Sequence, residues 1–137
     1  MRPLFIDSGP LVAAANPGDQ YAEKAERAWR NLAEDPRPLI SSQHVLDEMA
    51  TAICRTQTPR RAAQWVRQQF DSGLIRFLDG TPDDIISACK WLERYSDQKV
   101  NFTDALSFTL MTRESISEAF TFDRHFALAG FLKWPTH

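Results

Sequence analysis

Short apolar runs alternate with longer amphipathic segments along the chain, and this alternation restricts the folds that are possible. Short apolar runs bounded by turn residues are typical of buried strands, whereas apolar residues spaced three and four apart mark one face of a helix. Strands that alternate with helices form a parallel sheet joined by right-handed crossovers, with helices on both faces. The sequence therefore predicts an α/β fold with three layers, α/β/α, around a central and mostly parallel sheet.

The strands and helices can be placed along the chain from these patterns. Strands are predicted at residues 3–7, 39–41, 74–78 and 119–122. Helices are predicted at residues 21–32, 45–53, 59–70, 81–92 and 103–111, with short helices after residues 8–10 and before residues 131–132. Thr81 can cap its helix, with Pro82 at the first helical position and Asp83 and Asp84 in the first turn. The helix start explains these two acids, so they are not candidates for a functional site.

The size and composition of the chain suit one domain, which we expect to cover residues 1–137. The formal net charge of -2 means that any contact with nucleic acid depends on local basic patches. Cys54 and Cys89 lack a C-x-x-C partner, so we expect reduced thiols that fill small gaps in the core rather than a disulfide. The sequence offers no leader and no apolar stretch long enough for a membrane span, which predicts a cytoplasmic protein.

Four acidic residues end a predicted strand or begin the helix that follows one. Asp7 and Asp123 each follow an apolar run, Glu48 lies about one turn into the helix after the second strand, and Asp104 opens a later helix. The carboxyl ends of parallel strands share one edge of the sheet, where such folds bind their ligands. We therefore expect these four carboxylates to converge at this edge.

Converging carboxylates repel one another, and a divalent cation relieves that repulsion. Oxygen ligands without paired Cys or His favour Mg²⁺ or Mn²⁺ over zinc. A cation held in this way can activate water and neutralise charge on a phosphodiester, so hydrolysis needs no nucleophilic side chain. Simpler explanations stay open for three of the acids: Asp104 and Asp123 could cap helices, and Glu48 could be solvated. They leave Asp7 unexplained.

Four motifs, in chain order, resemble those of one known family. They are Asp7-Ser8-Gly9-Pro10-Leu11-Val12-Ala13 after an apolar strand, a helical Glu48, Phe102-Thr103-Asp104-Ala105-Leu106-Ser107, and Phe120-Thr121-Phe122-Asp123-Arg124-His125-Phe126. Together they resemble the PIN domain over essentially the whole chain. The likeness is greatest to the VapC-type toxins of toxin–antitoxin pairs.

The resemblance implies an endoribonuclease that depends on Mg²⁺ or Mn²⁺, forms a homodimer and is inhibited by a small antitoxin protein. RNA would be the substrate, and the catalytic and metal-binding residues would be Asp7, Glu48, Asp104 and Asp123. The hydroxyls of Ser8 and Thr121 would orient a carboxylate or a water molecule bound to the metal. The alternative is a non-catalytic PIN module that binds RNA or a partner protein.

Two other classes of protein also place acids at the edge of a parallel sheet. A phosphoacceptor signalling domain would have adjacent acids after the first strand and a Lys near the end of a late strand, and neither is found here. A haloacid-dehalogenase-like phosphatase would have a second Asp two residues after Asp7, where the chain has Gly9. Both classes are disfavoured.

Other polar and aromatic residues have weaker claims to a function. His44 is expected to be solvated or capping, and His125 to fix its loop rather than bind metal, while Arg124 could contact phosphate. Scattered basic residues could form a phosphate-contacting rim, although they more often form a solvated surface: Arg55, Arg60, Arg61, Arg67, Lys90, Arg94 and Lys99. Trp29, Trp65, Trp91 and most Phe residues are assigned to core or dimer contacts rather than to base stacking.

Overall fold

A computed structural model describes residues 1–136, which form five strands and seven helices. In chain order they are β1 (Leu4–Ile6), α1 (Ser8–Ala15), α2 (Ala22–Glu34), β2 (Leu39–Ser42), α3 (Gln43–Thr56), α4 (Pro59–Ser72), β3 (Ile75–Leu78), α5 (Pro82–Arg94), α6 (Phe102–Arg113), β4 (Glu118–Phe120), α7 (His125–Leu128) and β5 (Leu132–Trp134). Strands thus alternate with helices as the sequence predicts. None of these helices combines the length and the apolar character that crossing a bilayer requires.

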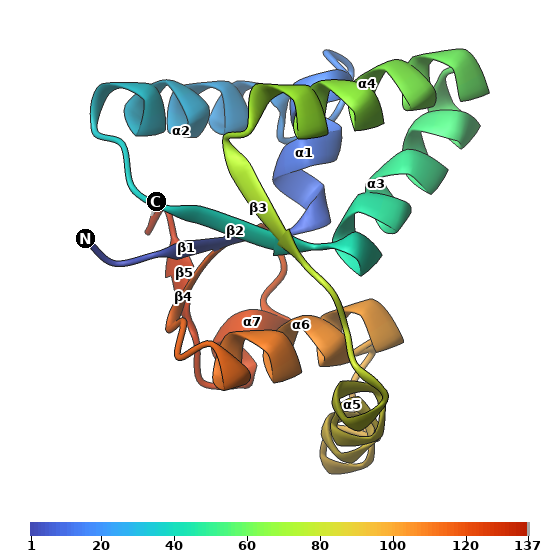
Figure 1. Ribbon diagram of the computed structural model, residues 1–137, viewed down its shortest axis with the longest axis vertical. Helices are drawn as coiled ribbons and strands as arrows, with labels where there is room; N and C mark the ends of the chain where they lie inside the picture. Colours follow the sequence, from blue (N-terminus) through green and yellow to red (C-terminus); the bar gives the residue numbers. More distant parts are fainter. Residues whose placement is uncertain (137) are drawn as a thin grey trace.

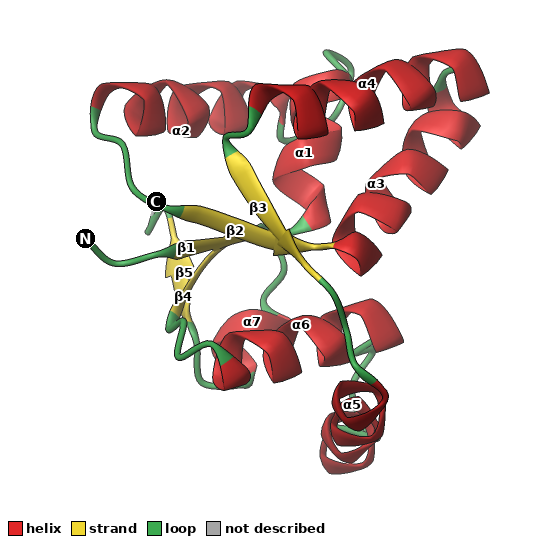
Figure 2. Ribbon diagram, in the orientation of Figure 1, coloured by secondary structure: helices red, strands yellow, loops and turns green. Residues whose placement is uncertain are grey.

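The strands form a single sheet in the order β3-β2-β1-β4-β5, and every neighbouring pair is parallel. Helices α1 to α4 cover one face of the sheet, and α5 to α7 lie on the other side (Figure 1). Figure 2 shows the same three layers with the strands between two sets of helices. The predicted α/β/α fold is confirmed, and its sheet is parallel throughout.

Strand β1 lies at the centre of the sheet, and its residues Leu4–Ile6 are all apolar. All three of its residues are fully buried, because strands pair on both of its edges and helices cover both faces. Phe5, Phe108, Phe120 and Phe126 are among the largest fully buried side chains of the core. Trp29, Trp65 and Trp91 pack against this core in half-buried positions, in agreement with the prediction for the tryptophans.

Local capping contacts fix where several helices begin. The side chain of Thr81 accepts from Asp84 N at 3.2 Å, and Thr81 N donates to Asp84 Oδ2 at 2.9 Å, which forms a capping box. Ser42 and Thr58 cap α3 and α4 in the same way through their hydroxyls. The assignment of Asp84 to the start of its helix is therefore confirmed.

One prediction about the C-terminal strands was wrong, and one strand was missed. Strand β4 ends at Phe120, so Asp123 lies in the following loop rather than at the end of the strand. The chain turns away because Asp123 N bonds to the Thr121 hydroxyl at 3.0 Å instead of to a neighbouring strand. Strand β5 was not predicted, since its three residues carry little pattern and become a strand only through pairing with β4.

The placement of the cysteines in the core was wrong for Cys54. Its side chain is exposed, and Cys89 is half-buried. On α3 the preceding residue, Ile53, is fully buried and faces the core, and successive helical positions point in different directions. Both thiols are free, as expected.

Candidate metal centre

Asp7 is held at the centre of the sheet edge. Its backbone N–H donates to Phe120 O at 3.0 Å, so the chain is still paired with β4 at the point where β1 ends. The Thr121 hydroxyl donates to Asp7 Oδ2 at 2.8 Å. The residue is only 5% exposed, and its carboxylate therefore has a fixed position close to the interior.

Asp104 is the third residue of α6 and shares a capping box with Asn101. Asp104 N donates to Asn101 Oδ1 at 2.8 Å, and Asn101 N donates to Asp104 Oδ2 at 3.3 Å. The simpler explanation for Asp104, a role in starting its helix, is thus correct as far as it goes. The same contacts orient its buried carboxylate, so capping does not exclude a second role.

Asp123 and Glu48 are oriented by residues close to the sheet edge. Asp123 Oδ1 accepts from His125 N at 2.8 Å, which places Asp123 ahead of the short helix α7. Glu48 lies in the second turn of α3, where its Oε1 accepts a hydrogen bond from the Ser8 hydroxyl. The hydroxyl next to Asp7 in the chain therefore positions the acid that comes from a different helix.

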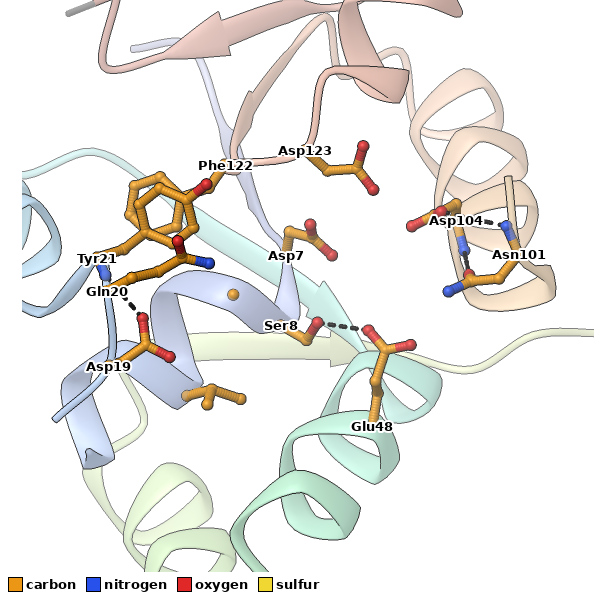
Figure 3. Close-up of a pocket in the computed structure, with 12 residues that line it drawn as sticks. Asp7, Ser8, Asp19, Gln20, Tyr21, Glu48, Asn101, Asp104, Phe122 and Asp123 are labelled. Atoms are coloured by element: carbon orange, nitrogen blue, oxygen red, sulfur yellow. Dashed lines mark hydrogen bonds between the residues drawn. The ribbon is translucent and has the colours of Figure 1, made fainter. Parts of the chain in front are cut away.

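All four predicted acids line one cavity of about 340 Å³. Figure 3 shows the carboxylates of Asp7, Asp104 and Asp123 around a common space, with Glu48 across from them. Its lining residues come from five parts of the chain: Asp7, Ser8, Gly9, Val12, Asp19, Gln20, Tyr21, Glu48, Asn101, Asp104, Phe122 and Asp123. The convergence expected from the parallel sheet is thus present in the structure.

Burial and mutual repulsion shift the acidity of two of these groups. Burial raises the pKa of Asp7 from 3.8 to about 7, with further rises from the charges of Asp104 and Glu48, while the Thr121 hydrogen bond opposes the shift. Burial likewise raises the pKa of Asp104 to about 7, with the charges of Asp123 and Glu48 adding to it. A cation that neutralised the cavity would therefore be bound in competition with protons.

The donor set suits a hard divalent cation. The four acids reach the cavity from four separate parts of the chain, and carboxylate oxygens are ligands that Mg²⁺ and Mn²⁺ prefer. Ligand atoms of Asp104, Asp123 and His125 all lie within 4.8 Å of one another. However, His125 Nδ1 is 2.9 Å from Asp123 Oδ1, and His125 is not among the residues that line the cavity. This position favours the predicted role of His125 in fixing the loop.

Several residues of the cavity were not identified from the sequence. Asn101 could have been found, because an Asn three residues before an acid is a recognisable capping pattern. Asp19 and Tyr21 could not, since they lie in the turn before α2 and only the fold brings them to the acids. The turn itself is held by Tyr21 N, which donates to Asp19 Oδ1 at 2.8 Å.

The basic residues proposed as a rim do not line this cavity, and neither do His44 and Arg124. The seven rim residues lie on α3, α4 and α5 or in the loop after α5. His44 is half-buried beside Gly80, and its Nδ1 has no hydrogen-bond partner among residues 1–136. Arg124 is exposed. None of the described residues that line the acidic cavity is basic.

Comparisons with known proteins identify the family of the chain and its fold. The family model for the PIN domain matches residues 4–132. The 23S rRNA-specific endonuclease VapC20 of Mycobacterium tuberculosis is 33% identical over 130 residues, which cover 95% of this chain and 96% of VapC20. The crystal structure of VapC20, described as a sarcin-ricin loop cleaving toxin, matches with a TM-score of 0.84 and 32% identity, covering 94% and 96% of the two chains.

More distant structures share the fold alone. VapBC2 from Rickettsia felis, solved with a DNA fragment from its promoter, matches with a TM-score of 0.68 and 12% identity, covering 96% of both chains. A toxin-antitoxin complex from Klebsiella pneumoniae matches with a TM-score of 0.58 and 15% identity, covering 88% of this chain and 87% of that one.

Proposed function

The chain belongs to the PIN-domain family, and from this premise we propose that it is a divalent-metal-dependent endoribonuclease that hydrolyses phosphodiester bonds in RNA. The observation that carries the proposal is the cavity in which Asp7, Glu48, Asp104 and Asp123 meet. Two of these acids have a pKa near 7 because they are buried together. A protein gains nothing in stability from such crowding, whereas a metal-dependent hydrolase requires it.

Asp7, Asp104 and Asp123 would be the principal ligands of the cation, and Glu48 would be a ligand or would orient the attacking water. When bound, Mg²⁺ or Mn²⁺ would activate water and neutralise charge on the phosphate and the leaving oxygen. The chain itself supplies the orientation of the acids. Thr121 holds Asp7, the backbone of Asn101 holds Asp104, and the Ser8 hydroxyl holds Glu48.

The proposed substrate class rests on a relative that matches nearly the whole chain. VapC20 is named for cleavage of 23S rRNA and described as acting on the sarcin-ricin loop. We extend this to the present chain and propose a structured loop of ribosomal RNA as its target. The same relationship supports a role as a toxin. We further propose that the chain belongs to a toxin–antitoxin pair, that a small antitoxin inhibits it, and that it acts as a cytoplasmic homodimer.

The test is cleavage of purified ribosomes and of deproteinised ribosomal RNA in Mg²⁺, in Mn²⁺ and in EDTA. We expect cleavage with either metal, none in EDTA, and none with Asp7→Asn. Asp47→Asn is the matched control, because Asp47 is exposed, lies next to Glu48 and does not line the cavity. RNA binding without cleavage in any metal would favour the alternative, a non-catalytic PIN module.

A further inference from the structure

Two hollows continue the surface of the acidic cavity toward α2 and β5. One, of about 350 Å³, is lined by Tyr21, Lys24, Thr121, Phe122, Lys133, Pro135 and Thr136. The other, of about 300 Å³, is lined by Lys24, Arg27, Ala28, Arg30, Asn31 and Pro135. The first shares Tyr21 and Phe122 with the acidic cavity, and the second shares Lys24 and Pro135 with the first. We call this continuous surface the basic groove.

Three cations of the basic groove are not neutralised by the protein. Within residues 1–136, Lys24, Arg27 and Lys133 have no carboxylate at ion-pair distance, and Lys24 Nζ lies 5.7 Å from the centroid of the Phe122 ring. Arg30 differs, since its guanidinium is 2.7 Å from Glu26. In a chain with a net charge of -2, three neighbouring unpaired cations form a local site for an anion.

Two elements, α2 and β5, supply these cations. Lys24, Arg27 and Asn31 are spaced three and four apart on α2, so they lie along one face of that helix. Lys133 comes from β5, the edge strand next to β4. The positive charges therefore come from two separate elements and line two hollows next to the acidic cavity.

A pair of aromatic rings forms the junction between the basic groove and the acidic cavity. Tyr21 and Phe122 stack with ring centroids 4.4 Å apart and 16° between their planes, and both line the cavity (Figure 3). The Tyr21 side chain is 37% exposed, so part of its ring can be reached by a ligand. Aromatic rings next to a positive groove are the arrangement that binds the bases and phosphates of single-stranded RNA.

We infer that the basic groove carries the RNA strand on one side of the cleavage site, with Lys24, Arg27 and Lys133 on its phosphates and Tyr21 against a base. The inference rests on the proposed function, because the cavity that begins the groove is where the scissile phosphate must lie. That continuity favours RNA over an acidic protein segment as the occupant. It also replaces the rim predicted from the sequence, whose residues lie on α3, α4 and α5 or in the loop after α5.

The test compares two triple variants that remove the same charge. The groove variant removes the three positive charges of the basic groove through Lys24→Ala, Arg27→Ala and Lys133→Ala. The α3/α4 variant removes three exposed cations that have no carboxylate partner in the described chain, through Arg55→Ala, Arg60→Ala and Arg67→Ala. Binding of a fluorescent sarcin-ricin hairpin RNA is measured by anisotropy in an Asp7→Asn, Asp104→Asn background, which prevents cleavage. Cleavage rates are measured with the acids intact.

We expect the groove variant to bind the RNA about tenfold or more weakly than the parent protein at physiological salt. The slope of log affinity against log salt concentration should become less steep by about 2, as expected for three lost phosphate contacts to a single strand. The α3/α4 variant should bind and cleave like the parent protein. Lys24→Arg, Lys133→Arg should retain binding, which separates charge from folding. Tyr21→Ala should weaken binding with little change in the salt slope.

Two different results would be negative, and they can be told apart. If the chain with intact acids cleaves no RNA in any metal, the proposed function fails. If it cleaves RNA and the groove variant binds as tightly as the α3/α4 variant, the inference about the groove is overturned. The positive charges of the basic groove would then be assigned to contact with a protein partner.

Discussion

The hydroxyl of Thr121 donates to Asp7 Oδ2 at 2.8 Å and so joins the loop after β4 to the end of β1. The Thr121 hydroxyl oxygen in turn accepts a hydrogen bond from Asp123 N at 3.0 Å. One buried side chain from a residue outside the acidic quartet therefore fixes two of its members. The relative positions of Asp7 and Asp123 therefore depend on this hydroxyl as well as on the pairing of β1 with β4.

Replacement of Thr121 by Val should separate metal binding from folding. Val keeps the shape but removes the hydrogen bond that lowers the pKa of Asp7, so protons should compete better with the metal. We expect metal affinity to fall about 10-fold to 100-fold, the usual range for residues that orient ligands. Titration calorimetry with Mn²⁺ measures this. Thr112→Val, which removes a hydroxyl bond to Phe108 O within α6, should leave the affinity unchanged.

Asp7→Asn and Asp104→Asn should each stabilise the metal-free protein at neutral pH. In the unfolded chain these acids ionise near 3.8, whereas in the folded protein they retain protons up to about pH 7. Between these values the folded state binds more protons, so stability falls as pH rises. The amide avoids this penalty, and the free energy of unfolding should rise by about 1 to 3 kcal/mol at pH 7.5.

Urea denaturation in EDTA at pH 4.5 and at pH 7.5 tests that prediction. The gain should be large at the higher pH and smaller at the lower one, because pH 4.5 lies only slightly above the pKa of the unfolded acids, so little of the penalty has accumulated there. Asp47→Asn, an exposed carboxylate outside the cavity, should show no such dependence. Destabilisation by Asp7→Asn at pH 7.5 would contradict the account of repulsion among buried acids.

Metal affinity should depend on pH in the neutral range. Since the pKa of both Asp7 and Asp104 is about 7, a cation must displace protons below that pH. We expect Mg²⁺ affinity to rise from pH 6 to pH 8 and then to level off. The two acids titrate as a coupled pair, so the curve should be broader than for one group. An affinity independent of pH across this range would show that the acids are already ionised.

Ser8→Ala should reduce turnover more than it reduces metal affinity. The Ser8 hydroxyl donates to Glu48, the acid assigned to orient the attacking water, and not to the principal ligands. We expect cleavage to fall about 10-fold or more while Mn²⁺ affinity changes by less. Ser72→Ala, at the exposed end of α4, is the control and should alter neither value. An equal loss in both would make Glu48 a principal ligand.

The acidic quartet could be predicted because each member lies beside a local pattern. Asp7 follows a run that is buried on both faces, and Asp104 begins a helix at a predictable cap, so both could be placed at the sheet edge from sequence alone. Asp123 was assigned to the right edge but to the wrong element. The turn at Thr121 depends on a side-chain contact with the backbone that the apolar pattern does not report.

The basic groove could not be predicted because it exists only through long-range packing. Lys24 lies on α2 and Lys133 on β5, two elements far apart in the chain, and β5 itself has no sequence pattern of its own. A rim built instead from the richest basic segments placed the charges on α3, α4 and α5. The number of Arg residues in a segment is a weak guide to an RNA-binding surface, since it does not show whether that segment lies near the acidic cavity in the fold.

The central position of β1 limits how this protein can be controlled. Its backbone is bonded to neighbours on both sides, with Leu4 N on Pro38 O at 2.9 Å and Asp7 N on Phe120 O at 3.0 Å. Amide hydrogens in such a strand exchange with solvent only when the whole domain opens. A change in the backbone position of Asp7, which directly follows this strand, would therefore break bonds on both sides of β1. A molecule that bound the folded protein and covered the cavity would therefore block access to the acids without displacing Asp7, and the acids would keep their arrangement when it dissociated.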